Sequence, residues 1–243
     1  MTDQPSTNSA KLDRTGALAG ISFTVLGLAA AVSVPLPPAV DDPASEIRDY
    51  VVDHQTALGV STVLYAASIL AFVAFVAMVH RRLSASGRSP VAAGTFLVAG
   101  TACVTLGLLG SLIEASLVQR IGPVADAATV ATWFQVWDLV AFTGPPLAVS
   151  LAVAVAAFVL YGDRTFPRWL APVAAAAVIL GTVGVVIDLA GDGVVPAAFD
   201  LAGFLLANVW IVGISVTVLL RSRSGAEEAS VLGASTPARP ITT

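Results

Sequence analysis

Long apolar runs alternate with short polar segments along almost the whole chain. Six runs are long enough to cross a bilayer, which takes about 20 helical residues at 1.5 Å per residue. Because lipid offers the backbone no hydrogen-bonding partners, we expect each run to be an α-helix. The predicted spans are residues 15–34, 56–79, 91–113, 139–160, 170–187 and 201–220. The pattern therefore predicts an all-α, polytopic transmembrane bundle of six spans.

The ends of the chain are polar. Residues 1–14 and 221–243 are rich in Ser, Thr, Pro and charge, which is typical of disordered tails. A basic start before an apolar run also opens secretory signal peptides, so a cleaved signal within residues 1–33 is the alternative. The first run is longer than the usual h-region of about 7 to 15 residues, which favours a retained first span.

The first outer loop carries the pattern of a short interfacial helix. Asp42 is suited to capping its start and Pro43 to its first position. Apolar and aromatic positions then recur at helical spacing. These positions are Ile47, Tyr50, Val51 and His54.

Composition agrees with a membrane protein and leaves little room for a soluble domain. Of the 243 residues, 56% are hydrophobic and only 12% are charged, about half the charged share of an ordinary soluble domain. No basic patch indicates nucleic acid. Cys103 is the single cysteine, which excludes an intrachain disulfide and a multi-cysteine metal site.

The basic residues predict the orientation. Of the 12 Lys and Arg residues, only Arg48 and Arg120 fall in outer loops of a six-span arrangement. Positively charged loops are retained on the cytoplasmic side. We therefore expect both termini in the cytoplasm and the chain in the inner or plasma membrane.

Small residues recur at positions where helices can approach closely. Gly16 and Gly20 form a GxxxG pair in the first span, and a stripe at every fourth position follows in the third. Packing within the bundle is the favoured explanation, and a homo-oligomer or a membrane protein partner is the alternative. The stripe consists of Ala99, Cys103, Gly107 and Ser111.

Five acids lie where spans meet the outer interface. Converging carboxylates would form a vestibule that attracts cations, protons or amines. The simpler explanation is that acids at helix ends reach water. His54 is a candidate ligand or pH sensor beside them. The acids are Asp53, Glu114, Asp138, Asp188 and Asp200.

The fourth span contains Pro145 and Pro146, which remove backbone donors and predict a helix break or kink. Broken helices line substrate sites in transporters, with Asp138 nearby as a possible partner. Proline is also tolerated in many membrane helices. Asn208, inside the sixth span, is expected to form an interhelical hydrogen bond.

Several catalytic patterns are missing from the sequence. No ionisable residue falls near the middle of a predicted span, which argues against a proton pump. No HExxH, GxSxG or Walker-type motif is found, so a protease or an ATPase is poorly supported. We expect no cofactor and no enzymatic activity.

The layout over residues 15–221 combines a basic start, one span, an acidic outer loop with prolines and a short helix, and a five-span block rich in Ala, Val and Leu. This layout resembles that of uncharacterised six-span membrane proteins of actinobacteria. The excess of Arg over Lys is typical of a GC-rich genome. The resemblance implies a fold but no activity.

Three functions remain open at this point. The first is a non-enzymatic membrane or envelope component that acts through helix packing and assembly. The second is a small transporter or a cation- or ligand-binding protein that uses the outer acids and the break at Pro145 and Pro146. The third is an intramembrane enzyme acting on lipid, with the same acids as its catalysts.

Overall fold

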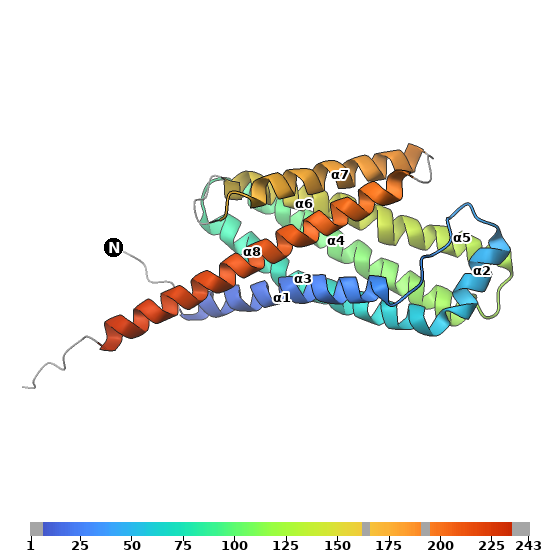
Figure 1. The fold of residues 1–243 in the computed structure, drawn as a ribbon, viewed down its shortest axis with the longest axis horizontal. Helices are drawn as coiled ribbons and strands as arrows, with labels where there is room; N and C mark the ends of the chain where they lie inside the picture. The colour runs from blue at the N-terminus through green and yellow to red at the C-terminus, as the bar shows by residue number, and fades with distance from the viewer. Residues whose placement is uncertain (1–6, 162–165, 191–194, 235–243) are drawn as a thin grey trace, which may run out of the picture.

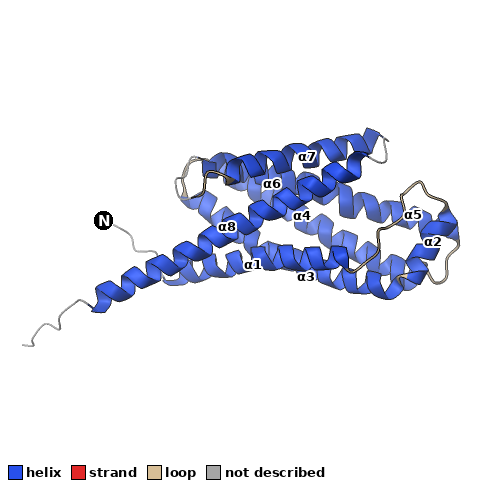
Figure 2. Ribbon diagram, viewed as in Figure 1, coloured by secondary structure: helices blue, strands red, loops and turns tan. Residues whose placement is uncertain are grey.

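The computed structural model describes residues 7–161, 166–190 and 195–234, and these residues form helices joined by short loops (Figure 2). Six helical segments are long and apolar enough to cross a membrane, which confirms the predicted six-span helical bundle. They are Ser9–Val32, Gln55–Ala85, Pro90–Ile121, Ala127–Leu160, Leu170–Ile187 and Leu201–Ser222.

The spanning helices form a closed ring. The helices are α1 (Thr7–Val32), α3 (Gln55–Ala85), α4 (Pro90–Ser116), α6 (Gly144–Tyr161), α7 (Leu170–Ala190) and α8 (Val195–Ala234). Each packs against the next in this order, and α8 returns to pack on α1 (Figure 1). Helix order around the bundle is thus the same as order along the chain.

Two further helices lie at one end of the bundle. These are α2 (Ala44–Asp53) and α5 (Ala127–Asp138), which pack against each other (Figure 1). Following the orientation predicted from the charges, we call this end outer and the end with Arg81 and Arg82 inner. The outer end has its own apolar cluster, separate from the main core between the spanning helices.

The prediction of α2 is confirmed, but its predicted cap is wrong. Pro43, and not Asp42, occupies the N-cap position. The Asp42 carboxylate instead accepts a hydrogen bond from the Ala39 N–H at 2.7 Å. Short polar side chains readily satisfy such local turn donors in place of a helix start.

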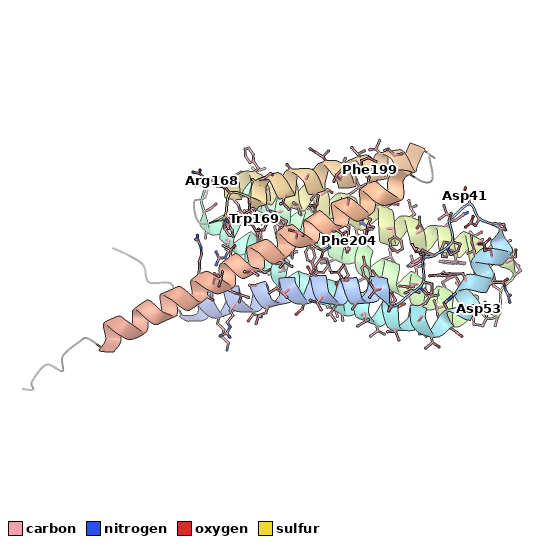
Figure 3. The ribbon with its side chains drawn as sticks, in the orientation of Figure 1. Asp41, Asp53, Arg168, Trp169, Phe199 and Phe204 are labelled. Carbon is pink, nitrogen blue, oxygen red and sulfur yellow. The ribbon has the colours of Figure 1, made fainter. Side chains whose placement is uncertain are left out.

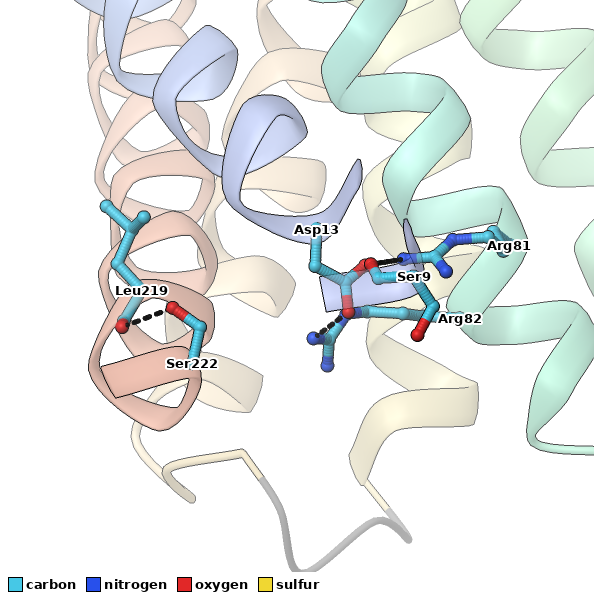
Figure 4. A network of polar contacts seen from close by, with 6 residues as sticks. All are labelled: Ser9, Asp13, Arg81, Arg82, Leu219 and Ser222. Carbon is cyan, nitrogen blue, oxygen red and sulfur yellow. Dashed lines mark hydrogen bonds and ion pairs between the residues drawn. The ribbon is translucent and has the colours of Figure 1, made fainter. Parts of the chain in front are cut away.

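Both predicted tails are shorter than expected. Helix α1 begins at Thr7, and its first turns are held by Asp13, whose carboxylate bridges Arg81 and Arg82 of α3 (Figure 4). Helix α8 continues to Ala234, because strong helix formers such as Ala and Glu follow the last span. Residues 1–6 and 235–243 lie outside the described residues.

Two π-helical turns interrupt the α-helical pattern. They are η1 (Leu117–Ile121), which extends α4, and η2 (Leu139–Thr143), which joins α5 to α6. The second directly precedes Pro145 and Pro146, so the span is widened there and not interrupted. A wider turn accommodates the proline rings and the missing donors, as π adjustments do in membrane helices.

Candidate functional site

Glu114 is a carboxyl group buried within the outer half of the bundle. Its exposed fraction is 5%, although the sequence placed it at the end of a span. The span continues past it through η1 to Ile121, so Glu114 lies more than one turn inside the helix. Helical spacing puts it on the same face as Gly107, Gly110 and Ser111, and that face is buried against neighbouring helices.

Three hydroxyl-bearing residues from two helices lie in the neighbourhood of this carboxyl. Thr62 of α3 faces it, and the Thr62 hydroxyl donates to the Leu58 carbonyl of its own helix at 2.8 Å. Tyr65 of α3 and Tyr50 of α2 interact electrostatically with Glu114. Thr62 and Tyr65 are three residues apart and so share one face of α3. No pattern in the sequence links these three residues to Glu114.

Helix α2 packs against α3, α5 and η1 at the outer end, next to the region of Glu114. The apolar stripe predicted for it points inward, with Ile47, Tyr50 and Val51 buried. The Tyr50 ring packs edge-on against Phe134 of α5, with ring centroids 6.5 Å apart, and its hydroxyl donates to the Pro35 carbonyl at 3.0 Å. Burial and the Glu114 carboxyl raise the pKa of Tyr50 to about 12.

Side-chain to backbone hydrogen bonds tie this outer layer to the rest of the molecule. Gln55 donates to the Val118 carbonyl at 3.0 Å, and Arg48 donates to the Ala125 carbonyl at 3.3 Å. A Cβ placed on Gly122 would lie 2.8 Å from Val51, so the backbone after η1 approaches α2 closely. The outer layer is therefore packed and is not a loose loop.

Asp53 and His54 lie at the outer surface. Asp53 is exposed at the end of α2 (Figure 3). The His54 ring is half-buried and packs at a tilt against the Tyr50 ring, with centroids 4.9 Å apart, and its Nδ1 lies 3.0 Å from the Tyr50 carbonyl. Tyr50 therefore lies next to both His54 and the region of Glu114.

Asp138 lies near the depth of Glu114 on a neighbouring helix. A Cβ on Gly110 would be 2.9 Å from the Ala141 Cβ, which fixes α4 against η2. Glu114 and Asp138 each lie about one turn further out from this contact. Asp138 is half-buried and has interactions of its own.

The two remaining acids of the predicted vestibule cannot be placed relative to Glu114. The side chains of Asp188 and Asp200 lie outside the described residues. Among the residues that are described, no three His, Cys, Asp or Glu side chains group as metal ligands. The convergence of all five acids in one vestibule therefore stays a prediction.

The small residues singled out in the sequence all pack within the chain. Cβ atoms on Gly16 and Gly20 would collide with Met78 and with Ser215 and Phe75. Ala99, Cys103, Gly107 and Ser111 are likewise buried. Neither set is exposed to a partner.

Asn208 does not form the expected interhelical bond. Its amide donates to the Phe204 carbonyl of its own helix at 2.9 Å.

Comparisons with known proteins add no candidate for the site: no family model matches the chain, and neither a curated protein nor a solved structure matches it.

Proposed function

We propose that this multi-pass membrane protein binds a small monovalent cation at Glu114. One observation supports the proposal: a carboxyl group with 5% exposure lies in the outer half of a membrane bundle, with Thr62 of the neighbouring helix facing it. An ionisable residue inside a membrane domain is costly and is by default a functional-site hypothesis.

The charge balance favours a cation. A buried carboxylate needs a positive partner or must be neutral. The ion pairs found among the described residues join Asp13 to Arg81 and Arg82 and do not involve Glu114. Carboxylate and hydroxyl oxygens are hard ligands, which suit an alkali cation, and a proton is the alternative occupant.

An assembly role through the small-residue stripes has less support. Gly16, Gly20 and the stripe of α4 are occupied by neighbours within the same chain. We place the protein in the inner or plasma membrane with both ends in the cytoplasm, on the strength of the distribution of basic residues.

The thermal midpoint of the purified protein tests the proposal. It should rise with Na⁺ or K⁺, relative to choline at equal ionic strength, because a ligand of the folded state stabilises it by about 2.7 kcal/mol at 100 times its Kd. Glu114→Gln should abolish this rise. Asp53→Asn, which changes an exposed acid at the same end, should retain it.

Two results would change the conclusion. Equal responses of the wild type and Glu114→Gln to every cation would remove Glu114 from the site. A midpoint that depends on pH in the wild type but not in Glu114→Gln, without any response to alkali cations, would identify the occupant as a proton.

A further inference from the structure

Three buried oxygen atoms lack hydrogen-bond partners among the described residues. They are Thr24 Oγ1, Asn208 Oδ1 and Ser215 Oγ, in side chains with exposed fractions of 8%, 4% and 0%. All three belong to α1 or α8. Buried polar groups in proteins nearly always have partners, and in lipid an unsatisfied group costs several kcal/mol.

The three atoms lie on facing sides of these two helices. Ser215 touches α1 at Gly20, where an added Cβ would be 2.4 Å from its Oγ. Thr24 follows Gly20 by one turn. Asn208 precedes Ser215 by seven residues, a separation that returns to nearly the same helix face.

The two helices separate toward the outer end. Figure 1 shows α8 crossing α1 near the inner end and diverging from it toward the end that carries α2. Thr24 and Asn208 lie on the outer side of the Gly20 contact with Ser215. The polar atoms therefore line the part of the seam where the helices move apart.

Helix α3 continues this seam to Glu114. Its Ser68 donates to the Phe23 carbonyl of α1 at 2.8 Å, and a Cβ on Gly27 would be 3.3 Å from the same Ser68 oxygen. Tyr65 and Thr62 precede Ser68 at steps of three residues, about 4.5 Å each along the helix. These two residues are the α3 neighbours of Glu114.

We infer that water molecules bind along this polar row between α1, α3 and α8, and connect the Glu114 site to the inner half of the bundle. Only the consequence of the row for a cation at Glu114 rests on the proposed function, and the binding of water does not. Hydroxyl groups donate and accept, and the Asn208 carbonyl accepts, so the row offers the mixed partners that a buried water needs.

The row has a direct consequence for a cation at Glu114. Water and hydroxyl oxygens keep an ion solvated as it leaves the carboxyl toward the inner side. The apolar cluster beneath α2 contains the Tyr50 hydroxyl on the outer side, and this hydroxyl is already bonded to the Pro35 carbonyl. A cation that leaves Glu114 toward the inner side therefore meets oxygen atoms as far as Ser215, where the apolar core of the inner half begins.

Reaction of substituted cysteines with Ag⁺ tests the row. The single native cysteine is first removed by Cys103→Ala, and Thr24→Cys, Asn208→Cys and Ser215→Cys are made in that background. Because the thiolate is the form that binds metal and needs water, these positions should react about tenfold faster, or more, than buried controls. Ag⁺ is added to protein in nanodiscs, and the remaining thiol is titrated after unfolding.

The controls lie in the same core but away from the polar row. Ile214 of α8 and Ala156 of α6 are as deeply buried, at 1% and 0% exposure, and Ile214 lies beside Trp210 and Leu170 on another face of α8. Rates at Thr24, Asn208 and Ser215 that do not exceed those of Ile214→Cys and Ala156→Cys would overturn the inference. The labelling does not depend on cation binding, so it can succeed even if the proposal for Glu114 fails.

A stability measurement applies if the cysteine variants do not fold. Thr24→Val preserves shape and removes the hydroxyl, whereas Thr217→Val removes a hydroxyl that is bonded to the Gly213 carbonyl at 2.8 Å. If water satisfies Thr24, its replacement should lower the thermal midpoint at least as much as Thr217→Val. A raised or unchanged midpoint for Thr24→Val would mean a dry, unpaired hydroxyl and would overturn the inference.

Discussion

Replacing Gly110 by alanine tests the close approach of α4 to the π turn that precedes the two prolines. A methyl group at this position would lie 2.9 Å from the Ala141 Cβ and 3.1 Å from its Cα. The second contact is with backbone, which cannot turn aside as a flexible side chain can. Inserting a methylene-sized group into a packed interior costs typically about 1–3 kcal/mol, and we expect a loss in this range.

The matched control is Gly94→Ala in the same helix. No atom lies within 4 Å of a Cβ at Gly94, so this variant should be at least as stable as the wild type, by up to about 1 kcal/mol from the higher helix propensity of alanine. Reversible unfolding in mixed micelles, followed by circular dichroism, gives both free energies. Trp137 is buried one turn from Ala141, so its emission should shift in Gly110→Ala alone. Equal stability of the two variants would refute the argument that this glycine fixes α4 against η2.

Two further predictions concern the ends of the bundle. The folded state holds the Tyr50 proton more tightly than the unfolded state, because burial raises the pKa of Tyr50 to about 12. Stability should therefore fall as pH rises from about 10 toward 12, by at most about 2 kcal/mol because solvent at the outer end screens part of the effect. Tyr50→Phe should remove this fall in pH-dependent unfolding. At the inner end, Asp13→Asn should lower the free energy of unfolding by about 1 kcal/mol or less, because the bridges of Asp13 to Arg81 and Arg82 are partly exposed (Figure 4). Unfolding measured at low and at high salt should show the smaller loss at high salt, because salt screens the ion pairs.

The six spans could be predicted because the bilayer imposes a length on every apolar run. The ends of the helices could not, because hydropathy marks where lipid begins and not where the backbone stops being helical. Thus α5 and η2 extend the fourth span outward to Ala127, and Trp137, which precedes the predicted start of that span, is buried in the outer apolar cluster. Asp13 likewise sits in a helix, and not in a tail, because α3 supplies two arginines for it.

The candidate site around Glu114 could be predicted only in part, for a related reason. The sequence gives the depth of Glu114 along its helix, but not which neighbour its face meets. The spacing of Thr62 and Tyr65 predicts that they share a face, yet their relation to Glu114 requires knowing that α3 packs beside α4. Tyr50 was expected in an interfacial helix, and nothing in its local pattern indicates that this helix lies next to an acid.

The outer and inner sides of Glu114 differ in the residues that an ion would meet on its way to the carboxyl. On the outer side, α2 is held by apolar packing and by hydrogen bonds such as that of Gln55 to Val118, so an ion could pass only when this layer opens locally. On the inner side, polar atoms continue from Thr62 along α3 to Ser68 and the α1–α8 seam. This row ends at the contact of Gly20 with Ser215, and the apolar core closes the inner half beyond it. Loosening of α2 should therefore speed the exchange of a cation at Glu114 with the outer side.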